Sequence, residues 1–543
     1  MKIPQRFSIL SHTQIQLLTL VEAAIQWLML LMFCSVYTGR PNKLRSHLPE
    51  ADKSMNASSI LKKLLTCLVF VFGYCAPALA QSEPQPIELG SVTFSGNVRE
   101  RYEEWDWFQS KTPSENLYGF SGTQIQFGLS QTLQNFDWNI EFEVPVLLGL
   151  PNGAVKPPPQ GQLGLGGSYY AANDKTQNTA FIFPKQVFIR PKWGRNSLQI
   201  GRFEFTDGSE VKPKDATLAS LKVERIAQRL IGNFGYSDVM RSLDGLHYVY
   251  SNGPWNFTAV SAIPDRGVFQ VDGWGWVDTP VSYVALTREG DYGATQLEWR
   301  VFGIFYNDDR GVVKVDNRSA AAKAADLGGI DIGTYGGHFI MASATSVGTF
   351  DLLGWGVLQS GKWGTLTQRS GAGTIEGGYQ PHFAKAVRPW FRAGYDYTSG
   401  DGNPNDDTHG TFFAILPTPR LYARFPFFNS MNNRDVFGEV VLRPAKSLTI
   451  RSDVHGLWLS SGKDLWYSGG GAFQPSTFGF QGRPSGGDTK LANLYDISGD
   501  YKWGHGISLT LYFGWAQGGQ VIKNIYPADS NGALGYSEIN YRF

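Results

Sequence analysis

The 543-residue chain has little cysteine and little charge, and each shortage excludes a class of protein. Its three cysteines, Cys34, Cys67 and Cys75, all precede residue 81. The rest of the chain can therefore form neither a disulfide framework nor a thiolate metal site. Charged residues make up 17% of the sequence, below the usual share of about 25%. The mean hydropathy of −0.22 excludes a bundle of hydrophobic spanning helices.

The chain also lacks a strong positive charge and the short motifs of common enzymes. The first 80 residues hold 8 of the 48 Lys and Arg and 3 of the 47 Asp and Glu, so the remainder carries a net charge of −4. Because domains that bind nucleic acid carry a basic surplus, we expect no nucleic-acid partner. The sequence contains no H-E-x-x-H, P-loop or G-x-S-x-G motif. We predict a protein that is not an enzyme and uses no cofactor.

The N-terminal region carries a signal for export. A segment over 64–80 follows Lys62 and Lys63 and ends in Ala78-Leu79-Ala80, the pattern of a secretory signal cleaved after Ala80. A lipid anchor on Cys75 is disfavoured because the bulky Tyr74 precedes it. Since Met55 stands just upstream of the signal, we predict an over-called extension over 1–54, a signal peptide over 55–80 and an exported barrel over 81–543.

Aromatic residues (14%) and glycine (63 residues) are abundant. Segments of about ten residues with alternating polar and apolar side chains recur, as is typical of strands that span an outer membrane. We predict 18 such strands, at 91–105, 121–132, 136–146, 181–190, 196–205, 245–250, 255–263, 281–287, 295–306, 337–345, 350–360, 373–380, 385–398, 435–444, 447–459, 491–503, 507–518 and 533–543.

The connections between these strands alternate between short and long. An even strand count places both termini on one side, and we expect every short turn on that side, as in outer-membrane barrels. A soluble all-β repeat protein would show no such asymmetry. The last strand ends in Phe543, which resembles the C-terminal signal read by the barrel assembly machinery. The predicted fold is all-β: a transmembrane antiparallel barrel of about 18 strands with short periplasmic turns and long extracellular loops.

Charged residues within the predicted strands are assigned to the lumen, because a charge facing lipid at the midplane costs about 2–4 kcal/mol. In the strand at 385–398 we expect Pro389 to cause a bulge. Two interpretations remain open for such residues: arginine and carboxylate pair to rigidify the wall, or surplus arginines attract a passing anion. The candidates assigned by side-chain parity are Arg99, Arg101, Arg202, Arg388, Arg392, Asp396, Arg451 and Asp453.

Two segments resemble the alginate-export family of outer-membrane proteins. They are ERIAQRLIGNFGYSDVMRSLDGLHY at 224–248 and GYDYTSGD at 394–401. The resemblance implies a monomeric 18-stranded barrel with an arginine-rich constriction, plugged by loops, that exports a polyuronate. It carries over to Arg229, Arg241 and Asp244 in the first segment, to Asp396 and Asp401 in the second, and to Arg392, two residues before the second.

We therefore predict an outer-membrane porin or exporter that passes an anionic, alginate-like polysaccharide through an anion-selective lumen lined by arginines. The alternative is an uptake porin for small anionic solutes or oligosaccharides. Expected partners are the polysaccharide, outer-membrane lipid, the barrel assembly machinery and a periplasmic scaffold of a polymer secretion system.

One loop also bears on metal binding. Asp401, Asn403, Asn405 and Asp407 place oxygens at alternate positions, as a calcium loop does. The loop lacks the glycine at the sixth position and the distant glutamate, so we expect a solvated turn rather than a metal site.

Overall fold

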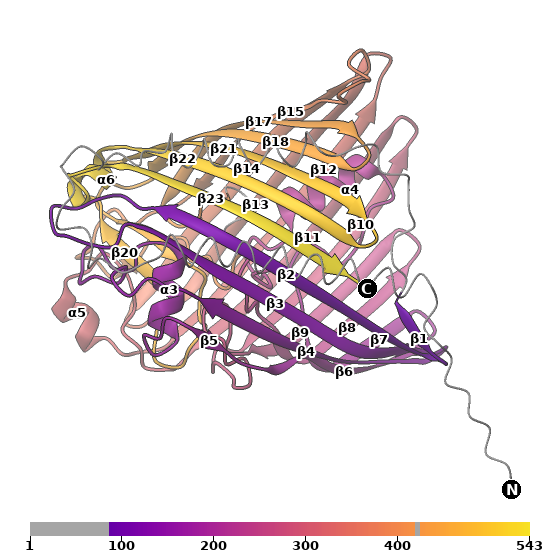
Figure 1. Cartoon of the computed structure of the whole chain (residues 1–543), viewed down its shortest axis with the longest axis horizontal. Helices are drawn as coiled ribbons and strands as arrows, with labels where there is room; N and C mark the ends of the chain where they lie inside the picture. Colours follow the sequence, from indigo (N-terminus) through magenta and orange to yellow (C-terminus); the bar gives the residue numbers. More distant parts are fainter. Residues whose placement is uncertain (1–85, 419–423) are drawn as a thin grey trace, which may run out of the picture. The chain divides into compact units, whose positions relative to one another are not determined.

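The computed structural model describes residues 86–418 and 424–543, which form a closed β-barrel (Figure 1). Eighteen strands make the wall, each antiparallel to both of its neighbours. The ring closes between β2 (Val92–Asp106) and β23 (Asn531–Arg542), with Asn97 opposite Arg542 and Asp106 opposite Ala533. The predicted fold class is confirmed. The proposed N-terminal extension and signal peptide lie outside the described residues.

The remaining wall strands follow one another around the ring in chain order. They are β3 (Leu117–Thr132), β4 (Phe136–Leu148), β6 (Phe183–Trp193), β7 (Asn196–Phe203), β8 (Leu243–Asn252), β9 (Trp255–Pro264), β10 (Val281–Tyr292), β11 (Thr295–Asp308), β12 (Ile330–Ala344), β13 (Gly348–Trp363), β14 (Leu366–Pro381), β15 (Trp390–Thr398), β17 (Asn433–Ala445), β18 (Leu448–Leu459), β21 (Lys490–Gly504) and β22 (Ile507–Gly518).

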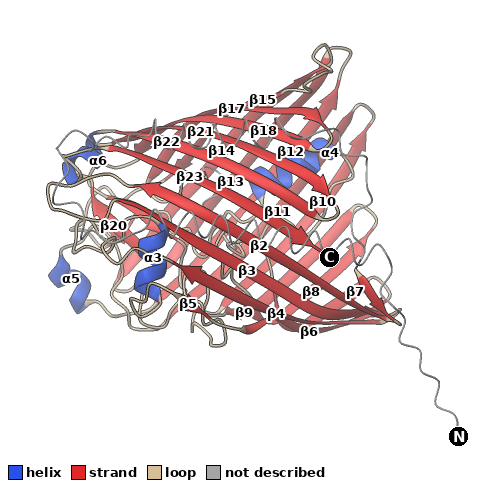
Figure 2. Ribbon diagram, in the orientation of Figure 1, coloured by secondary structure: helices blue, strands red, loops and turns tan. Residues whose placement is uncertain are grey.

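The other elements belong to the connections between wall strands (Figure 2). No helix in the described residues is both long enough and apolar enough to cross a membrane. The helices are α3 (Leu165–Ala172), α4 (Ala216–Leu221), a π-helical turn η3 (Lys222–Ile226), α5 (Ala320–Ala325) and α6 (Gln520–Ile525); the short strands are β1 (Ile87–Leu89), β5 (Thr179–Ala180), β16 (Thr408–His409), β19 (Leu465–Gly469) and β20 (Phe480–Pro484).

Side chains alternate between the two faces of the wall, as β15 illustrates. Phe391, Tyr395 and Tyr397 are at least 40% exposed, whereas Trp390 and Arg392, on either side of Phe391, are buried. Successive residues of a strand point to opposite faces, so the aromatic set faces lipid and Arg392 faces the lumen.

The connections at the two ends of the barrel differ in length. Eight connections lie at the end that holds both termini, and seven of them have two or three residues. Most connections at the opposite end are long, and the prediction that every short turn lies beside the termini was wrong at one place. Strands β13 and β14 are joined at the long-loop end by the two residues 364–365. Gly364 has φ +62°, the left-handed conformation that lets so tight a turn form without a Cβ clash.

The start of β15 also differs from the prediction. The strand begins at Trp390 rather than at 385, and Pro389 stands just before it instead of inside a bulge. Proline has no N–H to give to the ladder, which accounts for the position of the strand end. Arg388 therefore lies in the connection 382–389, with φ +40° and an exposed side chain whose Nε donates to the Arg443 carbonyl at 2.8 Å. The structure thus corrects its assignment to the lumen.

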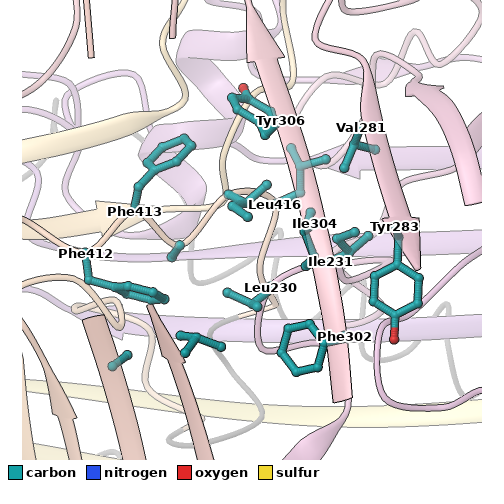
Figure 3. Packing of buried hydrophobic residues seen from close by; sticks show 14 of the residues in the cluster. Leu230, Ile231, Val281, Tyr283, Phe302, Ile304, Tyr306, Phe412, Phe413 and Leu416 are labelled. Carbon is teal, nitrogen blue, oxygen red and sulfur yellow. The ribbon is translucent and has the colours of Figure 1, made fainter. Parts of the chain in front are cut away.

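Part of the inner wall is apolar because loop segments pack against it (Figure 3). Tyr283 of β10 and Ile304 of β11 point inward and are fully buried. Leu230, Ile231 and Leu416, which come from two long connections, join them in one cluster. Burial of each such aliphatic side chain stabilises the packing by about 1.5–3 kcal/mol. Parts of the connections 204–242 and 399–432 are therefore held inside the barrel.

Candidate functional site

The connection 204–242, between β7 and β8, crosses the lumen and is held by charged pairs. Lys222 of η3 lies 2.7 Å from Glu298 on β11, and Glu224 accepts a hydrogen bond from Arg451 on β18. Arg99 of β2 donates to the Gly235 carbonyl at 2.6 Å. Because β2, β11 and β18 lie on different parts of the ring, this connection, hereafter the plug, spans the lumen.

The plug is most densely paired with the wall at Glu376 of β14, which belongs to a group of four charged residues. Both Glu376 oxygens accept from Arg225 Nε at 2.9 Å, and Arg229 Nη2 lies 3.4 Å from the same carboxylate. Arg392 of β15 reaches it from the wall at 2.6 Å. All four side chains are at most 8% exposed. Glu376 therefore ties two plug arginines and one wall arginine to a single buried carboxylate.

Two further carboxylates complete this group. Asp396 accepts from Arg229 Nη1 at 2.9 Å, and Asp351 of β13 accepts from Arg392 Nη1 at 2.6 Å. Charge-assisted bonds of this kind are about twice as strong as neutral ones. The structure thus brings together Arg229, Arg392 and Asp396, which the two resembling segments carried separately.

Arg99 and Arg101 hold the other side of the plug. Arg99 Nη2 donates to the Ser237 carbonyl at 2.5 Å and lies 3.3 Å from Asp238. Arg101 forms an ion pair with Glu538 of β23 at 2.6 Å and donates to the Tyr236 carbonyl. Both arginines are buried inner-wall residues.

Arg241 joins three loop segments rather than lining an open path. Its Nη1 donates to the carbonyls of Gly232 (3.0 Å) and Leu416 (2.8 Å), and its Nη2 donates to that of Gly470 (2.6 Å). These carbonyls belong to the connections 204–242, 399–432 and 460–489. Burial lowers the pKa of Arg241 to about 10, so the side chain is still a cation at neutral pH.

The remaining candidates lie on the inner wall or in a loop. Arg202 of β7 pairs with Asp244 of β8 at 2.6 Å, and Arg451 of β18 lies 3.7 Å from Glu439. Asp453 of β18 is buried on the same inner face.

The acidic loop after β15 forms local turns. Asp401 Oδ1 accepts from the Asn403 amide at 2.9 Å, and Asn403 Oδ1 accepts from the Asn405 amide at 3.3 Å. Asn405 and Asp407 are exposed. In the described part of the chain, the group of side chains with metal-ligand spacing lies elsewhere, on β18 and β21.

The packed loops leave cavities, of which two are described below. One, of about 250 Å³, lies among the long connections and is lined by Trp107, Tyr236, Phe269 and other aromatic side chains. The second, of about 370 Å³, lies between the plug and the walls of β2, β3, β4, β6 and β23, and we call it the polar cavity. It is lined by Asn97, Arg99, Gln124, Gln126, Glu141, Gln186, Glu204, Asn233, Gly235, Met240, Glu538, Asn540 and Arg542.

Comparison of the sequence with protein-family models identifies the family of the chain. A family model described as alginate export matches residues 221–535, which is more than half of the chain. The chain belongs to the alginate-export family. The match covers Arg225, Arg229, Glu376 and Arg392, so the wall on which the plug is pinned lies within the matched region. Membership in this family and the closed barrel identify an outer-membrane channel of the porin type.

Solved structures with a fold similar to this alginate-export family barrel include OccAB2 and OpdK. OccAB2 of Acinetobacter baumannii superposes with a TM-score of 0.51 at 8% identity, over 84% of this chain and 99% of that one. OpdK of Pseudomonas aeruginosa gives a TM-score of 0.48 at 9% identity, over 83% and 98% of the two chains. At such identities the likeness shows the fold alone. No curated protein sequence matches the chain significantly.

The sequence analysis predicted Arg229, Arg392 and Asp396 but missed several of the charged residues that they contact in the lumen. Glu376 lies in the predicted strand 373–380, where charge within a strand could have marked it. Arg225 and Glu224 lie in the plug, where no periodicity indicates their position. Asp351 and Glu439 had the same strand signal as Glu376.

Proposed function

We propose that this barrel passes an anionic polysaccharide, an alginate-like polyuronate, outward across the outer membrane, without chemistry on the polymer. The observation that carries the proposal is the combination of the family match with an arginine-bearing polar cavity beneath the plug. The cavity lies in the half of the barrel toward the short turns, where a polymer from the periplasm would enter.

The lining of the polar cavity suits a sugar acid. Six amide side chains offer paired donors and acceptors for hydroxyl groups, and Arg542 offers a fork that binds carboxylates. Three glutamates, Glu141, Glu204 and Glu538, share the surface. They weaken the hold of any one arginine on a uronate. Conduction needs entry to be favourable and each site to be weak enough to leave.

The arginines of the plug and wall would continue the path. Several of them, such as Arg229, Arg392 and Arg451, are paired with carboxylates, the same chemical group that a uronate presents. The Arg451–Glu224 and Arg101–Glu538 pairs each include a carboxylate side chain that is at least 18% exposed. Exchange of such a partner for a uronate would provide a series of moderate sites as the plug shifts.

Current recordings in planar bilayers test the proposal. Polyuronate added to the short-turn side should block the open channel, and Arg542→Gln should raise the blocking concentration about tenfold or more, since one bond to a charged group contributes about 1.5–3 kcal/mol. The matched control is Arg310→Gln, which removes a loop arginine whose Nη2 lies 2.7 Å from Asp308, away from the polar cavity.

The same recordings distinguish a polymer exporter from an uptake porin for small anionic solutes. Equal blockade by monomeric uronates and by polymer at the same uronate concentration would favour small-solute uptake. A cation-selective channel that polyuronate does not block would contradict both versions of an anion path.

A further inference from the structure

Four buried titratable side chains meet on the inner wall where β17, β18 and β21 run side by side (Figure 1). Asp453 of β18 and Asp496 of β21 are directly opposite each other, and Asp435 of β17 contacts His455 of β18. Each of the four is at most 8% exposed. Like charges directly opposite on paired strands repel, and buried charges need compensation.

The nearby arginines have other carboxylates within reach. Arg451 is paired with Glu224 and lies 3.7 Å from Glu439, and Arg424 lies 3.8 Å from Asp500. Three carboxylates and one imidazole are thus grouped on this stretch of the inner wall, and three of these side chains have the spacing of metal ligands.

The histidine is oriented as metal-binding histidines are. Its Nδ1 lies 2.8 Å from Asp435 Oδ2, so this ring nitrogen is occupied by a carboxylate. Its Nε2 is buried and has no hydrogen-bond partner among the described residues, and the same holds for Asp453 Oδ1. A carboxylate on one ring nitrogen fixes the tautomer and leaves the other nitrogen's lone pair for a metal.

We propose that His455, Asp453 and Asp496 bind a divalent transition-metal ion, with Zn²⁺ as the preferred ion and Asp435 as the residue that positions the imidazole. One ligand atom from each of the three residues lies within 4.8 Å of the other two. Ligands at about 2.0–2.2 Å from a tetrahedral zinc ion lie roughly 3.3–3.6 Å apart, so carboxylate rotations close the site. Tyr512 Oη donates to Asp496 Oδ1 at 2.5 Å and holds that carboxylate from the far side.

The donor set selects among ions. One imidazole and two carboxylates suit zinc, whereas calcium and magnesium prefer oxygen ligands alone. Three protein ligands leave a fourth position for water. A bound ion would link β18 to β21 directly, and to β17 through Asp435.

The experiment uses untagged protein refolded in detergent without lipopolysaccharide, so that neither a histidine tag nor lipid phosphate competes for metal. After treatment with EDTA, calorimetric titration with ZnCl₂ should show one saturable site, and Co²⁺ should give the visible absorption bands of a low-coordinate histidine site. His455→Gln and Asp496→Asn should each abolish the site. Asp435→Asn should weaken affinity about 10- to 100-fold, as loss of an outer-sphere partner does.

The matched control is His247→Gln. His247 also has a buried Nε2 without a partner among the described residues, but its ring packs against Phe203 and Phe205. This variant should bind one Zn²⁺ as the wild type does. Absence of saturable Zn²⁺ and Co²⁺ binding in the wild type would overturn the proposal without recourse to any variant. Unchanged binding in a His455→Gln protein that keeps the gel mobility of the folded barrel would also overturn it.

Discussion

Replacing Glu376 by Gln should release the plug from the wall. The carboxylate is fully buried and accepts from Arg225, Arg229 and Arg392. Glutamine keeps one acceptor oxygen but removes the charge, so three buried guanidinium groups share the remaining carboxylates Asp396, Asp351 and Glu439. Removing one partner of a buried ion pair costs about 3–5 kcal/mol.

This cost destabilises the docked state of the plug, because two of the three guanidinium groups belong to the plug. A loss of about 3 kcal/mol raises the population of the undocked plug roughly 100-fold, at 1.4 kcal/mol for each factor of ten. Hydrogen exchange of the amides in 222–231, followed by mass spectrometry, should accelerate by about that factor. Single-channel conductance should rise because an undocked plug leaves more of the lumen open.

The control is Asp351→Asn. Asp351 is equally buried and bonds to Arg392 and to Trp390 Nε1 at 2.7 Å, both of which are wall residues. This substitution removes a similar charge but should leave exchange in 222–231 close to that of the wild type. Equal exchange in the two variants and the wild type, in barrels of normal gel mobility, would refute the view that Glu376 pins the plug.

Three further predictions concern the loops and the seam, the pairing of β2 with β23 that closes the ring. The buried His409 ring stacks on Trp363 with the ring centroids 4.1 Å apart, and burial lowers the pKa of His409 to about 3. The imidazole is therefore neutral while the loop is folded, whereas in a loosened loop it takes up a proton below about pH 6.5. Going from pH 7 to pH 5 should therefore raise proteolysis of 399–432 by roughly tenfold or more, and His409→Gln should remove this pH dependence; equal pH dependence in both proteins would contradict the assignment. Arg241→Gln should increase cleavage in 204–242, 399–432 and 460–489 together, and loosening of one segment alone would argue against a shared clamp. Deleting Phe543 removes two backbone bonds to Gly96, at 2.9 and 3.0 Å, and should slow refolding into lipid vesicles, whereas an unchanged rate would show that the seam closes without it.

The alternation of side chains was enough to locate the wall strands. A membrane barrel has only two faces, so the period of two residues is sufficient to assign Arg99, Arg392 and Asp453 to the inner one. The ends of the strands were harder to predict from the sequence, because they depend on single residues. Pro389 ended β15 early and moved Arg388 out of the lumen, while Gly364 allowed a two-residue turn where a longer connection was expected.

The inner network could not be derived from the strands. Arg225 meets Glu376 across 151 positions of sequence, through a connection whose path has no periodicity. The apolar inner face of β10 and β11 is explained only by the loop residues Leu230 and Leu416 that cover it. Alternation tells which face a residue occupies, whereas the partner it finds there depends on how the loops fold inward.

The most direct test of the central claim is release of polymer from proteoliposomes. Vesicles that contain the refolded barrel and enclose a fluorescent polyuronate should release it several-fold faster than neutral dextran of the same hydrodynamic size, and Arg542→Gln should reduce that difference while Arg310→Gln should not. Release of both polymers at one rate, or retention of the polyuronate while small anions escape, would contradict a path for an anionic polysaccharide.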